Sequence, residues 1–466
     1  MNVLPVAAAP GRREFALCGL VVAGILAVLL LIDARGGGET PAAFILAIVA
    51  AYGVVCLARL ETAFAILLAV TPFSVEVAFR GSGAALQIPT EPMLFVALAA
   101  WGLRFLSRGS TTFSQPFLTG AVIVALLASL VSLIDTAHPL NGLKATLNAG
   151  WYGLFGLFVW NNFARRDRLG GMAAAWLVPG VLICLYSFVR VAIGEYTPMA
   201  GYWSADPFFT EHGTFAAYLS FVCLLALALA LEMRGGAKLL LSIVALLSAA
   251  QVVLSLTRGA WLGMGAGLLF LLVVSGRRLR HTGNVFLGLA GAATLIVVVL
   301  ATGALGSIEK QTQNITRADY VSNLERVNRW YAGWNMFVSD PVTGVGFGTY
   351  TDNYIQYRRF PLGTEQSEMY MGVHSEYLKV LSETGLVGVF AAALALGAVL
   401  AVARRAISRS AGDPFVRGLA VGLTGGLITY LVHGTVNNYM VYDKAAIPVW
   451  TAVGLLAAID TLKKPR

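Results

Sequence analysis

Charge is scarce in this chain. Only 12% of its 466 residues are Asp, Glu, Lys or Arg, whereas 58% are hydrophobic. So little charge is not typical of a soluble domain. The apolar residues come in runs of about 20, the length that crosses the hydrocarbon core of a bilayer. The sequence therefore predicts an all-α, polytopic helical membrane protein.

Cysteine is also rare, and nucleotide-binding motifs are missing. The four cysteines lie inside apolar runs, without disulfide or metal-ligand spacing: Cys18, Cys56, Cys184 and Cys223. The chain has no Walker loop, no dinucleotide fingerprint and no convincing internal repeat, the last of which marks many secondary transporters. We therefore expect no metal, no cofactor and no nucleic-acid partner.

The apolar runs predict about 14 membrane spans. They lie near residues 15–33, 41–58, 62–79, 90–107, 116–134, 143–162, 170–190, 214–232, 239–257, 259–275, 284–305, 376–402, 416–436 and 444–462. Arg12 and Arg13 precede the first run as in a signal peptide, but no small-residue cleavage site follows. We therefore predict an uncleaved first helix.

The positive-inside rule sets the orientation. With both termini in the cytoplasm, 20 of the 33 Lys and Arg residues lie in short cytoplasmic loops and termini. The chain then divides into an N-terminal transmembrane bundle (1–306), a large periplasmic loop (307–373) and C-terminal transmembrane helices (374–466). The bundle includes a short external loop at 191–213 and an external hairpin at Arg258.

The large loop contains a predicted amphipathic helix over 323–337. Leu324, Val327, Tyr331 and Trp334 recur at steps of three and four residues, so the helix is expected to lie flat on the membrane or across the bundle. Arg326 and Arg329 on it are either solvated charges or an anion clamp. The glycine-rich turn 344–348 that follows either holds phosphate through its amides or packs tightly under the loop.

Three further positions stand out on the same predicted side. Arg258 lies in a tight hairpin, where it either snorkels or is aimed into a cavity by its small neighbours. His212, in an aromatic loop, is more simply a solvated histidine than a catalytic one. His374 directly follows the large loop; a lone histidine is usually structural, but this position favours catalysis. Lys379 and Glu383, one helical turn apart, are expected to neutralise each other.

These segments resemble the O-antigen ligase and O-antigen polymerase superfamily. The resemblance rests on Arg326 and Trp330, on the run 340–350, on the run 374–378, and on Glu383 with the two residues after it. The run 257–263 also resembles the family's Ser-Arg-Gly element, and Ser375 stands where the family commonly has asparagine.

The resemblance implies a GT-C-like glycosyltransferase of the bacterial inner membrane. Such enzymes transfer a glycan from undecaprenyl diphosphate to a sugar hydroxyl on the periplasmic side, without metal or nucleotide sugar. The acceptor is lipid A-core for a ligase and another repeat unit for a polymerase. By position, the family's functional arginines correspond to Arg258 and Arg326, and its loop-end histidine to His374.

The chemistry of these residue types agrees with that implication. Two guanidiniums stabilise a diphosphate leaving group, and a neutral His374 accepts the proton of the attacking hydroxyl. Arg329, Trp330, Tyr377 and His212 are the predicted substrate-binding residues. The reaction would be an inverting displacement, with a polymerase slightly favoured over a ligase. A bicarbonate-like small-anion transporter and a protein O-oligosaccharyltransferase remain alternatives.

Overall fold

The computed structural model describes residues 42–78, 85–108, 115–194, 197–279, 321–359 and 372–462. Its elements in chain order are α2 (Ala42–Ala58), α3 (Leu60–Val70), η1 (Thr71–Phe73), β1 (Val75–Ala78), β2 (Ala85–Ile88), α4 (Thr90–Arg108), α5 (Pro116–Val131), α6 (Pro139–Phe163), α7 (Arg166–Ile193), α8 (Pro198–Tyr202), α9 (His212–Glu232), α10 (Gly235–Leu254), α11 (Arg258–Leu279), α14 (Val321–Ser339), α15 (Tyr350–Tyr357), α17 (Glu376–Arg409), α18 (Pro414–His433) and α19 (Asp443–Asp460).

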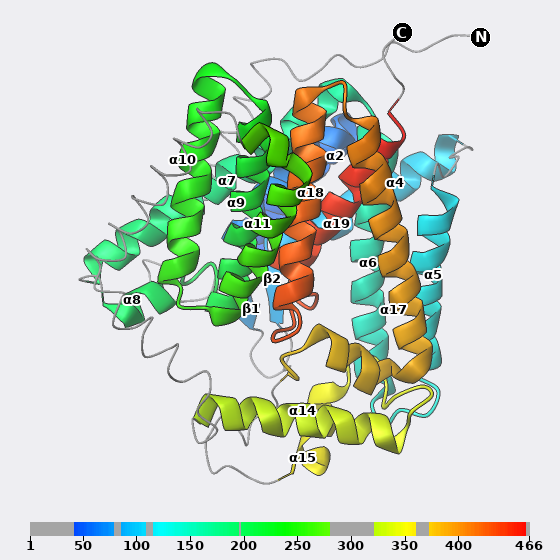
Figure 1. Ribbon diagram of the computed structural model, residues 1–466. Coiled ribbons are helices and arrows are strands. Elements are labelled where there is room, and N and C mark those ends of the chain that lie inside the picture. Colours follow the sequence, from blue (N-terminus) through cyan, green and yellow to red (C-terminus); the bar gives the residue numbers. More distant parts are fainter. Residues whose placement is uncertain are drawn as a thin grey trace.

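The long helices form a bundle, and α14 lies across one end of it (Figure 1). Within the described part of the chain, six helices are long and apolar enough to cross a membrane: α7, α9, α10, α11, α17 and α18. Helix α9 is the most enclosed of them, packing against α10 and α18. The prediction of a helical membrane protein is confirmed, and so is a helix over 323–337 that lies flat on the bundle.

Twelve of the fourteen predicted spans coincide with helices, and the other two, 15–33 and 284–305, lie outside the described residues. The prediction for 62–79 is wrong at its end, because α3 stops at Val70. Pro72 lies in the short 3₁₀ turn η1, and the chain then forms β1, which pairs antiparallel with β2 with Val75 opposite Ile88. Alternating apolar residues in Val75-Glu76-Val77 suit a strand, so this hairpin is an exception to the all-α prediction.

The predicted hairpin at Arg258 is confirmed. Helix α10 ends at Leu254, Leu256 takes a left-handed conformation with φ of 53°, and Arg258 is the first residue of α11. Glycines of α11 then bring it against α18. A Cβ on Gly263 would lie 2.7 Å from the carbonyl oxygen of Thr429, and one on Gly259 would meet the ring of His433. The small neighbours of Arg258 therefore allow the close helix contact expected from the sequence.

Helix α17 is kinked at Gly385. This residue has φ of 57°, and a Cβ there would lie 2.4 Å from the carbonyl oxygen of Val342, so only glycine fits the position without strain. The kink turns the first part of α17, residues 376–384, across the bundle end next to α14, while the remainder runs along the bundle (Figure 1). The predicted span 376–402 is thus two helical pieces, of which the second continues to Arg409.

The end of the bundle opposite α14 is held by ion pairs. The Asp460 carboxylate of α19 accepts from Arg405 at 2.9 Å and lies 2.8 Å from the Arg409 guanidinium, and Arg417 pairs with Glu232 at 3.3 Å. Arg166 also pairs with Asp413. These arginines therefore have carboxylate partners.

The contact between α11 and α18 yields a stability prediction. Gly263→Leu should lower the melting temperature of the purified protein, because overpacking a close helix contact costs about 1–3 kcal/mol. Gly265→Leu is the matched control, since a Cβ at Gly265 meets nothing within 4 Å. Thermal unfolding in detergent, followed by tryptophan fluorescence, measures both variants. Equal melting temperatures for the two would contradict the packing described here.

Candidate functional site

The segment before α17 is bound to the loop between α18 and α19. The backbone amide of Glu376 donates to the carbonyl of Gly434 at 2.8 Å, and its carboxylate accepts from the amides of Tyr439 and, at 2.8 Å, Met440. The amide of His374 donates to Asn438 Oδ1 at 3.0 Å. Two regions about 60 residues apart in sequence are thereby held side by side beneath α14.

A chain of hydrogen bonds orients the His374 ring. Nδ1 of His374 lies 3.0 Å from Asn437 Oδ1, and Asn437 Nδ2 donates to Glu211 Oε1 at 3.3 Å. Because the Asn437 oxygen also accepts from the Asn438 amide, it is an acceptor, and His374 Nδ1 must carry the proton. The lone pair of the neutral ring is then on Nε2. His374 itself has φ of 52°, a strained conformation of the kind found at functional sites.

The pKa of His374 favours the neutral ring. Burial lowers this pKa to about 4, the positive charges of Arg329 and Arg326 lower it as well, and the bond to Asn437 acts in the opposite direction. The ring is therefore uncharged near neutral pH and keeps its Nε2 lone pair available for a proton.

Arg326 of α14 lies among positive charges. Burial lowers the pKa of its guanidinium, and Arg258 and Arg329 lower it further. Tyrosines are the only described groups that act in the other direction, and among the described residues no carboxylate pairs with Arg326. A half-buried arginine in this setting would be stabilised by a bound anion.

Arg329 differs from Arg326, although it lies less than one turn away. It is 4% exposed, its guanidinium is 4.0 Å from the Glu325 carboxylate, and its carbonyl accepts from the Tyr350 hydroxyl at 2.7 Å. Arg329 thus has a partner on its own helix, and its charge acts on His374 from within the protein.

The remaining predicted site residues have packing roles. His212 is the first residue of α9 and its ring lies 3.6 Å from the Tyr202 ring, so the interpretation as a solvated loop histidine is wrong. Trp330 packs against the small core that contains Val373. Tyr377 donates from its hydroxyl to the carbonyl of Leu431 at 2.8 Å and so links α17 to α18.

The glycine-rich turn 344–348 packs tightly. Two of its amides donate to carbonyls of α17, and those of Gly348 and Tyr350 donate to the Glu383 carboxylate at 2.9 and 3.2 Å. These donors are used within the protein, which supports packing rather than phosphate binding. Glu383 therefore anchors the turn, and the Lys379 ammonium lies 5.8 Å from the centre of the Phe347 ring.

Sequence reasoning missed the partners from α9, α18 and the loop after α18. His433 is 2% exposed, lies 4.8 Å from the Tyr439 ring, and senses the charge of Arg326. Asn437, Asn438 and Glu211 were also missed. The one available signal was a histidine and two asparagines just after an apolar span, on the predicted side of His374.

The part of the chain that matches a known protein family includes this site. Residues 243–393 match the O-antigen ligase family model. The resemblance to the O-antigen ligase and polymerase superfamily is confirmed. The matched range begins within α10, ends within α17, and contains Arg258, Arg326 and His374. A search of curated proteins found no match.

The role of Glu383 as an anchor can be tested. Glu383→Ala leaves the amides of Gly348 and Tyr350 without an acceptor, which costs about 1–3 kcal/mol for each buried amide. We expect a lower melting temperature for this variant. Glu383→Gln, which retains one acceptor oxygen, should recover part of the loss. If the Glu383→Ala variant has the same melting temperature as the unchanged protein, the carboxylate does not hold the turn.

Proposed function

We propose that this protein transfers a glycan from undecaprenyl diphosphate to a sugar hydroxyl, as an O-antigen or exopolysaccharide polymerase or as an O-antigen ligase. One observation carries the proposal. Arg326 has no carboxylate partner among the described residues, and it is close enough to Arg258 and to the neutral His374 ring for its charge to act on both. The family match supports the general class of reaction.

Arg258 and Arg326 hold the donor diphosphate. When the bond between the anomeric carbon and the diphosphate oxygen breaks, the electron pair and a negative charge pass to the diphosphate. Two permanently charged guanidiniums, one of them half-buried, stabilise this new negative charge in the transition state more strongly than they stabilise the bound donor before reaction. Arg329 assists through its field, since its own guanidinium is near Glu325.

His374 activates the acceptor. The acceptor hydroxyl attacks the anomeric carbon, a new carbon–oxygen bond forms, and the hydroxyl proton moves to Nε2 of His374. Because Nδ1 donates to Asn437, Nε2 is the nitrogen that is free to accept. A single displacement of this kind inverts the configuration of the anomeric carbon. His212, Trp330 and Tyr377 shape the site around these groups.

The proposal includes an orientation. The protein is a GT-C-like enzyme of the bacterial inner membrane, with both termini in the cytoplasm and the α14 end of the bundle in the periplasm. The ion-paired arginines at the opposite end support this assignment, because cytoplasmic ends of membrane helices are rich in Arg and Lys. A repeat-unit acceptor would make it a polymerase and a lipid A-core acceptor would make it a ligase.

Two other functions are less well supported. A small-anion transporter is expected to have charged groups near the middle of the membrane, whereas the arginines of the site lie where α11 begins and on α14, across the bundle end. A protein O-oligosaccharyltransferase would use the same donor chemistry with a serine or tyrosine acceptor. Product analysis with purified protein, a defined lipid-diphosphate glycan and each acceptor separates these activities.

The roles of Arg326 and His374 predict large losses of transfer activity. His374→Ala should reduce the rate by about 10²–10⁴-fold, the usual contribution of a general base. Arg326→Ala should cause a loss of similar size, and Arg326→Lys should restore only part of it, because lysine lacks the bidentate guanidinium. Glycan transfer by purified variants measures this. Arg190→Ala, at an exposed arginine of α7, is the control. Full activity in folded Arg326→Ala or His374→Ala protein would refute the assigned roles.

The lowered pKa of His374 predicts the acid side of the pH profile. The ring is the active base when neutral, so kcat/KM should fall only as the pH approaches about 4. Arg329→Gln removes a positive charge that lowers this pKa, so the fall should move to higher pH. A profile that loses half its activity near the usual histidine value of about 6.5, in both proteins, would contradict this.

A further inference from the structure

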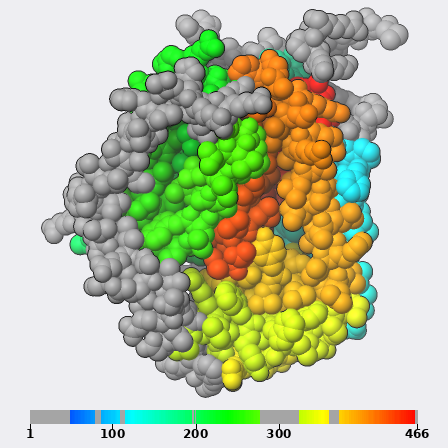
Figure 2. Space-filling view, viewed as in Figure 1, coloured from blue at the N-terminus to red at the C-terminus, as the bar shows by residue number. Residues whose placement is uncertain are grey.

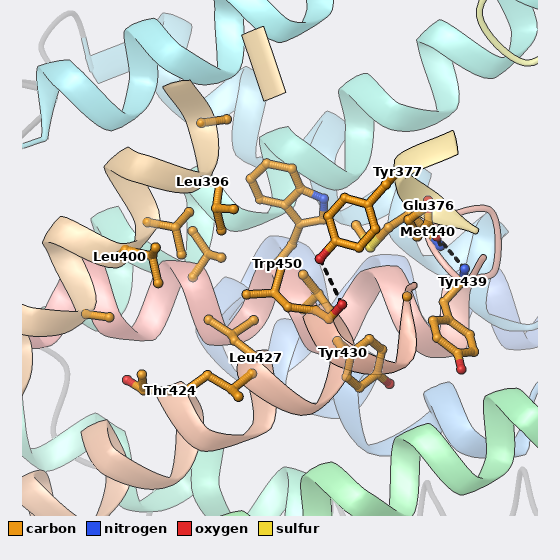
Figure 3. Close-up of a pocket in the computed structure, with 18 residues that line it drawn as sticks. Glu376, Tyr377, Leu396, Leu400, Thr424, Leu427, Tyr430, Tyr439, Met440 and Trp450 are labelled. Carbon is orange, nitrogen blue, oxygen red and sulfur yellow. Dashed lines mark hydrogen bonds between the residues drawn. The ribbon is translucent and has the colours of Figure 1, made fainter. Parts of the chain in front are cut away.

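An apolar groove runs between α17 and α18, with α19 as its floor (Figure 3). Its volume is about 260 Å³. Leu396 and Leu400 of α17 line it together with Leu427 and Leu431 of α18 and Trp450 of α19. In the space-filling view, a hollow separates the orange surface of α17 from the red-orange surface of α18 (Figure 2).

The groove follows the part of the bundle that is expected to lie in the membrane. Both walls are helices long and apolar enough to cross a bilayer. Leu400 in the groove is 47% exposed in the bare protein, so the groove is open at its side. On α17 the lining extends from Ala395 to Ala403, about 12 Å along a helix axis. This is less than half of a hydrocarbon core of about 30 Å.

One end of the groove reaches the candidate site. Glu376 and Tyr439 line that end, and the Tyr377 hydroxyl bridges to α18 there (Figure 3). The Tyr439 ring lies 4.8 Å from the His433 ring, and Arg326 interacts with both residues. This end of the groove therefore lies close to the half-buried Arg326.

A second cavity, of about 700 Å³, lies between α5, α6 and α17. Glu376, Ala395, Met440 and Trp450 line both spaces. The larger cavity includes polar groups such as Asn148, Lys379 and Asn438, whereas the groove is almost wholly apolar. The apolar groove therefore borders a cavity with a polar lining beside the His374 segment.

We propose that the groove between α17 and α18 binds the head-proximal part of the isoprenoid chain of the lipid-linked donor. The proposal rests on the proposed function and adds the site for the hydrocarbon part of the substrate. The chain leaves the arginine-held diphosphate past Tyr439, lies along Leu396, Leu400 and Leu427, and continues into the bilayer beyond Ala403. An extended hydrocarbon chain fits because the walls offer almost no polar partner and the side is open to lipid.

Donor chain length gives a direct test. Leu396→Trp fills the groove, and its control is Leu269→Trp, at a 60%-exposed leucine of α11 outside the lining. KM is measured for glycan-diphosphate donors that carry either an undecaprenyl chain or one five-carbon isoprene unit. With Leu396→Trp, KM for the long donor should rise about tenfold, the effect of losing roughly two buried methylenes. KM for the short donor, and both KM values of the control, should stay unchanged.

Labelling of the unchanged, full-length protein provides a second measurement. An undecaprenyl diphosphate analogue with a diazirine near its head should label residues of 395–403 and 424–431. Excess unlabelled undecaprenyl diphosphate should compete with it. Labelling confined to α11 would overturn the proposal, as would labelling of the groove by a diazirine phospholipid that the undecaprenyl competitor fails to displace.

The two hypotheses fail in different ways. If no donor of either length yields product with any acceptor, the proposed function is wrong. If both donors are used and Leu396→Trp changes their KM values equally, glycan transfer stands and the groove does not bind the chain.

Discussion

Positive charge gathered at one end of the bundle is the constraint on which the site depends. Arg258, Arg326 and Arg329 repel one another there, and burial removes much of the water that would screen them. Arg329 has Glu325 close by, but Arg326 interacts with tyrosines instead of carboxylates among the described residues. The protein tolerates this arrangement because packing of α14 over the bundle and the α11–α18 contact hold the helices that carry the charges. Under the proposed function, this arrangement exchanges stability for an anion site that is formed before its ligand arrives.

The same charges explain the state of the histidine. A carboxylate beside the histidine would raise the pKa of the ring, and a protonated ring accepts no proton. Here burial and the neighbouring arginines lower the pKa of His374, while Asn437 Oδ1 accepts a hydrogen bond from Nδ1 without adding negative charge. An aspartate at position 437 would orient the ring equally well but would raise its pKa. An amide between the ring and Glu211 therefore serves a base that must remain neutral among cations.

The sequence predicts much of the architecture because each membrane helix is marked by a local pattern, a run of apolar residues. The hairpin at Arg258 and the flat helix over 323–337 follow from such local patterns, and a family resemblance locates Arg258, Arg326 and His374. What was missed depends on contacts between distant residues. Glu211 and Asn437 are 226 positions apart, and no local pattern marks their hydrogen bond. Likewise, the charge of Lys379 acts on Glu383 as expected, but the sequence did not predict that the Glu383 carboxylate also accepts from the amides of Gly348 and Tyr350.

A two-substrate transfer on a lipid-borne donor must position three unlike things: a hydrocarbon chain, a dianionic head and a polar acceptor. Each has a matching environment in this fold, and the loop after α18 contributes to all three. Tyr439 lines the groove, His433 lies beside the arginines, and Asn437 orients His374. Because these residues lie at the end of α18 or in the connection after it, which is bound to Glu376, a shift of that connection would move all three together. Under the proposed function, the alignment of the donor with the base therefore depends on the hydrogen bonds between this connection and residues 374–376.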